Sequence, residues 1–251
     1  LLTASDPSDE KRVRELVLEG RTSLMAQVVQ HGSTFAYLRA AASLDLARFR
    51  QEQWSGVSQV RFLGGLAKQV ESSVAAARET IARMQKRVFT RGRVIANVTG
   101  DPELIRALRA PLDELIAALP EGKPGAPATT VAKFARSSGV AISAQVNYVA
   151  QALPIAGILS PAAPALEVLA GILSSDYLYN RLRVQGGAYG GHAVFRPNDG
   201  ILAFVSYRDP HLVETLDVYS GVGAFVRSGA IDEALLERSK IGAIGGFDHI
   251  L

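Results

Sequence analysis

The sequence predicts an α+β protein in which a helical first third precedes an antiparallel sheet with helices packed on it. Three observations lead to this class. Residues 1–90 carry apolar residues at helical spacing and show no strand alternation. Residues 192–195 and 201–207 read as two strands joined by the turn Pro197-Asn-Asp-Gly200. Such a hairpin is antiparallel, so a doubly wound parallel sheet is not expected.

A succession of helices is expected in the first third. The first helix begins at Ser8 as its N-cap, with Asp9 and Glu10 in the first turn, and it ends before Gly32. Apolar residues at helical spacing support this assignment. Further helices are predicted over residues 35–42, 44–53, 57–66 and 74–88.

Strands alternate with helices after Arg91-Gly92. Strands are predicted over residues 93–99 and 142–149. A long helix over residues 164–184, with Leu166, Leu169, Leu173 and Tyr177 on one face, is expected to end at Gly186-Gly187. The remaining helices are expected from Asp101-Pro102 towards Leu119 with a disturbance at Pro111, from Asp209-Pro210 to residue 226, and from 231 to 241.

Composition excludes several classes of protein. The 251 residues include 27 Lys and Arg against 24 Asp and Glu, and the formal net charge of +3 is too weak to favour nucleic acid as a partner. Cysteine is absent, which excludes disulfides, thiolate metal sites and cysteine nucleophiles. The most apolar stretch, residues 149–173, contains three prolines and Glu167. A strand end, a loop and a helix start are therefore expected there, and no membrane-spanning helix.

Common catalytic motifs do not occur in the chain. The histidines stand at no metal-binding spacing, and His211 lacks a second ligand after Glu214. The glycine-rich residues 186–191 follow a helix and lead into a strand, whereas a nucleotide-binding loop follows a strand and opens a helix. No Gly-x-Ser-x-Gly sequence is present. We therefore expect no metal site, nucleotide site or serine hydrolase in this chain. The four histidines are His31, His192, His211 and His249.

One segment keeps both a structural and a functional interpretation. In residues 179–191, Arg183 ends a helix and Tyr189 follows six residues later, flanked by glycine pairs. An arginine in the last turn favours the helix dipole, and glycines end helices, so a purely structural role is available. Alternatively, the glycines let a bound chain approach closely, and both side chains donate to one acceptor such as a peptide carbonyl.

The same segment carries a resemblance to a known family. Leu182-Arg-Val-Gln-Gly-Gly-Ala-Tyr-Gly-Gly191 resembles a signature in the C-terminal half of inverzincin, or pitrilysin-type, zinc metallopeptidases, most closely the presequence protease branch. Further stretches support the resemblance in the right order along the chain. They are Ser33-Thr-Phe-Ala-Tyr-Leu-Arg-Ala-Ala-Ala42, Gln53-Trp-Ser-Gly-Val-Ser-Gln-Val-Arg-Phe-Leu63, Gln145-Val-Asn-Tyr-Val149 and Phe204-Val-Ser-Tyr-Arg-Asp-Pro210.

The resemblance implies a domain organisation and a cofactor. Enzymes of this family consist of two similar halves that close around a chamber, and zinc belongs to the N-terminal half. Residues 1–90 would be the helical end of the third peptidase domain. Residues 91–251 would be the fourth domain, truncated at Leu251, and the first residue, Leu1, also suggests part of a longer chain. The implied partners are the N-terminal catalytic half and unfolded peptides, with no nucleic acid and no membrane.

The resemblance also implies roles for residues. Arg183 and Tyr189 would contact the substrate backbone and the transition state. Gly186, Gly187 and Gly190 would let the peptide approach, while Asn147 and Tyr148 would line the chamber wall. This chain would bind no metal and would be inactive alone. Bacterial cytoplasm and mitochondrial matrix both suit such a peptidase.

Two other interpretations remain open. The chain would be a zinc-free, catalytically silent subunit that binds peptides for a related peptidase. Otherwise it would be an unrelated α+β interaction domain. Zinc content and mass of the native polypeptide distinguish the first alternative, and peptide binding by variants of Arg183 and Tyr189 bears on the second.

Overall fold

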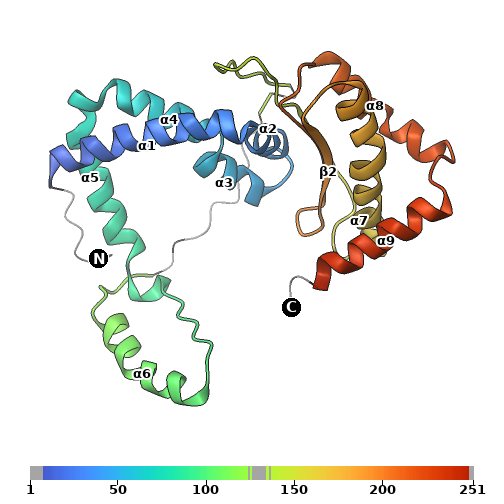
Figure 1. Ribbon diagram of the computed structural model, residues 1–251. Helices are drawn as coiled ribbons and strands as arrows, with labels where there is room; N and C mark the ends of the chain where they lie inside the picture. Colours follow the sequence, from blue (N-terminus) through green and yellow to red (C-terminus); the bar gives the residue numbers. More distant parts are fainter. Residues whose placement is uncertain (1–7, 124, 126–133, 136, 249–251) are drawn as a thin grey trace. The chain divides into compact units, whose positions relative to one another are not determined.

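The computed structural model describes residues 8–123, 125, 134–135 and 137–248 (Figure 1). The chain divides into two compact units. One contains the described residues of the ranges 1–22 and 63–128, and the other those of the ranges 23–62 and 129–251. The peptidase-domain boundary expected near residue 90 stays a prediction.

The helical character of the first third is confirmed. Its helices are α1 (Glu10–Gln30), α2 (Gly32–Ala41), α3 (Leu46–Ser55), α4 (Val57–Lys68) and α5 (Val70–Val88). The N-cap expected at Ser8 is wrong by one residue. Asp9 caps α1, since its carboxylate accepts the Arg12 N–H at 2.9 Å and its carbonyl accepts the Val13 N–H at 3.0 Å.

The strand predicted over residues 93–99 is wrong. A 3₁₀ turn, η1 (Arg91–Arg93), is followed by residues that pair with no described strand, and Ile95 is 95% exposed. An apolar run becomes a strand only where a second strand supplies hydrogen bonds. Helix α6 (Pro102–Ala117) begins as expected, because the Asp101 carboxylate accepts the N–H groups of Glu103 and Leu104. The disturbance expected at Pro111 does not occur, since the helix continues through it.

The sheet contains the expected hairpin. Strands β2 (Gly190–Arg196) and β3 (Ile201–Tyr207) pair antiparallel, and β1 (Ala150–Pro154) pairs antiparallel with the other edge of β3. The strand predicted over residues 142–149 is wrong, because regular pairing begins only at Ala150. Before that point, Asn147 makes an isolated bridge with Asp209.

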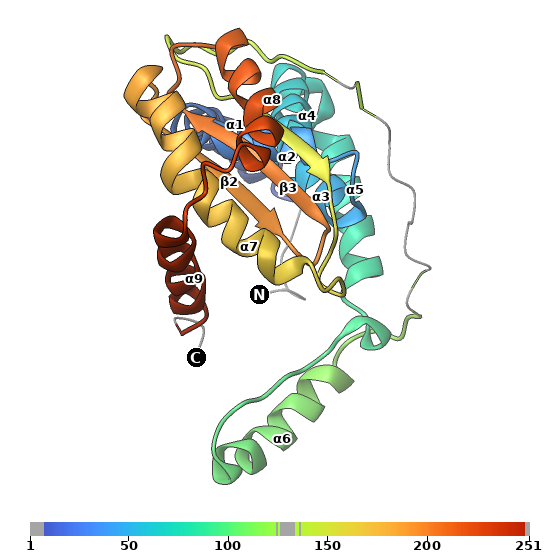
Figure 2. The same cartoon turned by 90° about the vertical axis from the view of Figure 1, so that its right-hand side faces the viewer.

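Helices cover both faces of this sheet (Figure 2). Leu202 and Phe204 of β3 pack in a core with α7 (Ala163–Ile172) and α8 (Val213–Arg227). Ile201, Ala203 and Val205 pack on the other face against Tyr37, Leu38 and Ala41 of α2. The central strand β3 is thus buried on both sides, which explains its continuous apolar sequence.

The long helix expected over residues 164–184 is confirmed, with a widened second half. α7 continues as π-helical turns, η2 (Leu173–Tyr177) and η3 (Tyr179–Gln185), and ends at Gly186 as expected. Helix α8 begins four residues after the expected Asp209, because Asp209 bridges Asn147. Helix α9 (Glu233–Asp248) lies beside α7 (Figure 1). Among the described helices, none is both long enough and apolar enough to cross a membrane.

Candidate functional site

Arg183 lies in the last turn of η3 and is exposed. Its Nη1 donates to the carbonyl of Tyr189 at 2.9 Å. Its guanidinium carbon lies 5.4 Å from the centre of the Tyr189 ring and 5.8 Å from the centre of the Tyr179 ring. The structure therefore brings Arg183 and Tyr189 together, as the sequence predicts. One donor of Arg183 holds the loop, and the other N–H groups of the fork are left for a ligand.

The glycines between these residues differ in what they do. Gly187 has a φ of +75°, a left-handed conformation that closes the helix end while its N–H donates to the carbonyl of Arg183 at 3.2 Å. A Cβ on Gly186 would lie 2.7 Å from the carbonyl oxygen of Leu182. Nothing lies within 4 Å of a Cβ built on Gly190. Gly186 and Gly187 thus shape the loop, and Gly190 leaves space in front of the strand.

Tyr189 presents most of its side chain to solvent. It is 63% exposed, and its N–H donates to the carbonyls of Tyr207 and Arg208 at 3.1 and 3.3 Å. Its ring meets the Tyr207 ring edge-on, with centres 5.8 Å apart and planes at 76°. No described residue bonds to its hydroxyl. The backbone of Tyr189 is therefore fixed on the sheet while the hydroxyl is available as a donor.

A row of four side chains runs across this end of the sheet. Arg183 lies beside Tyr189, Tyr189 meets Tyr207, and the guanidinium carbon of Arg208 lies 5.3 Å from the centre of the Tyr207 ring. We call these four residues the arginine–tyrosine row. Sequence reasoning assigned no role to Tyr207 and Arg208, although both lie in a stretch that carries the family resemblance. The pairing of β2 with β3 brings them to the site.

The two residues expected on the chamber wall make contacts within the fold. The Tyr148 hydroxyl donates to the carbonyl of Val29, near the end of α1. Its ring lies 5.7 Å from the Tyr207 ring, so it adjoins the arginine–tyrosine row. The Asn147 side-chain amide donates to the carbonyl of Asp209 at 3.1 Å. The polar groups of both residues are thus used internally, and a contact with substrate stays a prediction.

Two tyrosines beneath the site act as buried donors. Burial raises the pKa of Tyr219, whose hydroxyl donates to the carbonyl of Val149 at 3.0 Å. Burial also raises the pKa of Tyr177, against a smaller opposite effect of Arg181, and its hydroxyl donates to the carbonyl of Val218 at 2.9 Å. Both phenols are neutral and join the helices to their neighbours.

The described residues do not form a metal site. No group of three or more His, Asp or Glu side chains lies close enough there to hold a metal ion. His211 has one acidic neighbour, since its Nδ1 is 3.9 Å from a carboxylate oxygen of the exposed Glu214. His249 lies outside the described residues. The donor set of this part of the chain therefore does not fit zinc.

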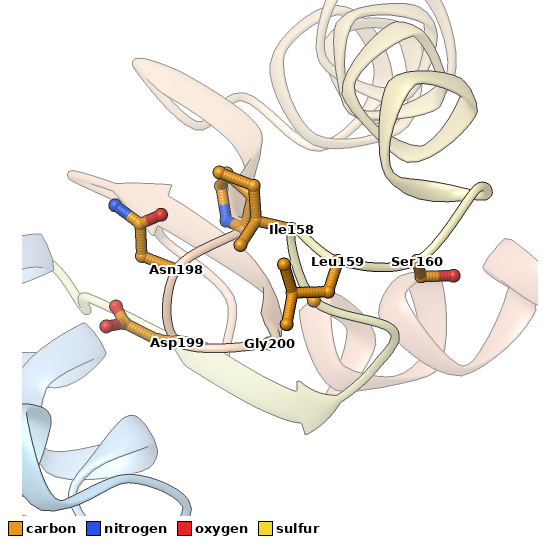
Figure 3. Close-up of a pocket in the computed structure, with 8 residues that line it drawn as sticks. Ile158, Leu159, Ser160, Asn198, Asp199 and Gly200 are labelled. Carbon is orange, nitrogen blue, oxygen red and sulfur yellow. The ribbon is translucent and has the colours of Figure 1, made fainter.

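A surface hollow lies at the far end of strand β2 from Tyr189 (Figure 3). Its volume is about 340 Å³, and it lies between the hairpin turn and the loop before α7. Backbone bonds close its floor, from Ile155 N–H to Gly200 and from Ile158 N–H to Pro197, both at 2.8 Å. The one charged residue of its lining, Asp199, pairs with Arg48 at 2.9 Å. This hollow is a product of loop packing and has no unpaired charge to bind a ligand.

Comparison with known proteins supports the family resemblance. Residues 138–250 match the family model described as the PreP C-terminal domain. Residues 1–66 match the associated domain of peptidase family M16, subfamily C. Over 96% of its length, this chain is 30% identical to presequence protease 1, chloroplastic/mitochondrial, of Arabidopsis thaliana. The chain is a relative of the presequence proteases.

Mitochondrial presequence proteases of two fungi are similarly close. The identity is 29% over 99% of this chain for Aspergillus fumigatus and 30% over 89% for Yarrowia lipolytica. The chain spans 22%, 24% and 23% of the plant protein and of these two fungal presequence proteases, respectively. The resemblance to the C-terminal half of a pitrilysin-type peptidase is thereby confirmed. The arginine–tyrosine row lies wholly within the region that matches the PreP C-terminal domain.

Proposed function

We propose that this chain is the substrate-holding part of a zinc metalloendopeptidase that degrades unstructured peptides. The observation that carries this proposal is the exposed pair Arg183 and Tyr189 beside the open backbone at Gly190. Both side chains are hydrogen-bond donors, and a peptide backbone offers carbonyl acceptors at every residue. The pair would hold a peptide by its backbone and would therefore accept many sequences.

The remainder of the enzyme would lie in another part of a longer polypeptide. The relatives are about four times longer than this chain, and the described residues contain no zinc-binding group. An N-terminal half would then hold the zinc and close the chamber, and this chain would be inactive alone. The relatives are named as mitochondrial or chloroplastic, which favours the mitochondrial matrix over the bacterial cytoplasm as the compartment.

Variants of the pair test the proposal in the complete polypeptide. Tyr189→Phe removes only a hydroxyl, and Arg183→Ala removes the guanidinium. We expect both to slow cleavage of an unstructured peptide, by about 10²–10³ if the donor also contacts the developing oxyanion. In a fluorescence binding titration, we expect affinity to fall about 2- to 10-fold for Tyr189→Phe and more for the charged Arg183.

A matched variant on the same helix controls for general effects on the surface. Arg181 is also exposed, and its Nη1 contacts Gln185 at 3.4 Å within η3. Arg181→Ala should leave cleavage and binding at the wild-type level. Unchanged cleavage and binding with both Tyr189→Phe and Arg183→Ala would overturn the proposed function.

A further inference from the structure

Arg208 has an unusual backbone conformation. Its φ is +48°, and it is the one residue other than glycine with a positive φ among those that the structure describes. The left-handed region is unfavourable for residues with a Cβ and is normally occupied by glycine or asparagine. A large charged residue at such a position suggests that its side chain has a function.

A β-bulge produces this conformation. Ala150 faces Val205 in the regular ladder, whereas Asn147 faces Asp209, so the strand that ends in β3 carries one extra residue between the two pairs. The Tyr189 N–H is shared between the carbonyls of Tyr207 and Arg208, as expected at an irregular position. Bulges redirect a side chain, and glycine is the usual residue at the left-handed position.

The guanidinium of Arg208 has no partner of opposite charge. The residue is exposed, and no described carboxylate or carbonyl bonds to its side chain. The adjacent carboxylate of Asp209 turns inward instead, where it accepts the His211 N–H and the Thr215 hydroxyl. Arg208 lies at the end of the arginine–tyrosine row opposite Arg183.

We propose that Arg208 binds a carboxylate of the peptide held by Arg183 and Tyr189. This inference rests on the proposed function and adds a second, charge-reading subsite to it. A guanidinium presents a planar fork that matches a carboxylate in a two-point hydrogen bond. Successive contacts of 5.4, 5.8 and 5.3 Å join the row. An extended peptide rises roughly 3.3 Å per residue, so about five residues span the row.

Peptides that differ only in charge test this inference with the full chain. The probe is a fluorescent ten-residue peptide without Asp or Glu, prepared as the free acid and as the C-terminal amide. A third peptide is amidated and carries one internal Glu. We expect the wild type to prefer one carboxylate-bearing peptide over the neutral amide by roughly three- to tenfold. The free acid identifies a chain terminus as the ligand, and the internal Glu identifies an acidic side chain.

Three substitutions separate a ligand role from a structural one. Arg208→Gly suits the left-handed backbone and should maintain or raise the urea midpoint of unfolding, yet it should abolish the carboxylate preference. Arg208→Gln should also abolish the preference. Arg208→Lys should retain part of it, because the charge remains without the fork.

The possible failures are distinguishable. Equal affinity of the wild type for the acidic and neutral peptides would overturn the role of Arg208. So would a preference that persists in Arg208→Gly. The proposed function would survive either result if Arg183→Ala and Tyr189→Phe still weaken binding of all peptides. If those two variants bind every peptide like the wild type, or if no peptide binds, both proposals fail.

Discussion

Asp209 is a buried residue on which the geometry of the candidate site depends. It is 1% exposed, and its two carboxylate oxygens accept the His211 N–H at 2.9 Å and the Thr215 hydroxyl at 2.7 Å. Its backbone bridges Asn147 in both directions, at 2.7 and 2.9 Å. These bonds fix the chain directly after the bulge at Arg208. A buried carboxylate requires such donors, because an unsatisfied charge there is costly.

Thr215→Val tests this arrangement without changing the shape of the side chain. The valine removes the buried donor to Asp209, and we expect unfolding in urea to show a loss of about 1–3 kcal/mol. Ser220→Ala is the matched control on the same helix, because the exposed Ser220 hydroxyl donates only to the carbonyl of Leu216. It should change stability by less than about 0.5 kcal/mol. Similar effects of both substitutions would refute a special role for the Thr215 hydroxyl.

The sequence predicted one half of the candidate site and missed the other for a physical reason. Arg183 and Tyr189 flank a helix end marked by glycines, so a local pattern suffices to place them near each other. Tyr207 and Arg208 reach them only through the register of β2 on β3 and through a bulge. Neither the register nor the extra residue leaves a local signal, because no glycine marks the left-handed position.

At the scale of elements, Gly32 allows α2 to begin against an aromatic ring. A Cβ on Gly32 would collide with the ring of Tyr148, whose hydroxyl bonds to Val29 in the preceding helix. We expect Gly32→Ala to destabilise the protein by about 1–3 kcal/mol, since the ring must move. Urea denaturation measures this loss, and the fluorescence of the tyrosines reports the displaced ring.

Gly171→Ala is the opposite case in helix α7. Nothing lies within 4 Å of a Cβ built there, and the residue is exposed. Alanine should therefore stabilise the helix by about 0.5–1 kcal/mol. The contrast between the two glycines depends on their surroundings. If both substitutions shifted the unfolding midpoint in the same direction, the assigned packing of Tyr148 on α2 would be wrong.

Helices were more predictable than strands because their hydrogen bonds are internal. The segment over residues 93–99 has the apolar alternation of a strand, but no described strand pairs with it. The π-helical turns were also missed. In retrospect, the buried Leu173 and Leu178 are five residues apart, a spacing that a π turn, and not an α turn, keeps on one face.

At the scale of the whole molecule, the helical first third contributes directly to the sheet. Tyr37, Leu38 and Ala41 of α2 cover one face of β3, so residues far apart in sequence share one core. Periodicity shows that such faces are apolar, but it does not show which face meets which. The α+β class was therefore predictable, whereas the covering of both faces of β3 required the structure.

Zinc content separates the substrate-holding part of a peptidase from a zinc-free partner subunit. Both alternatives predict that this chain alone binds no zinc, because its described residues contain no suitable ligand group. A ligand that binds only the folded state raises its stability, so EDTA and added zinc should leave the melting temperature of the chain unchanged. A shift in melting temperature with zinc, confirmed by bound metal after gel filtration, would contradict this prediction. The native polypeptide gives the decisive comparison, by elemental analysis and intact mass. One zinc on a chain about four times longer is expected for the peptidase, since this chain spans 22% of its plant relative. A short native chain without zinc would instead assign the arginine–tyrosine row to a subunit that presents peptides to another catalytic chain.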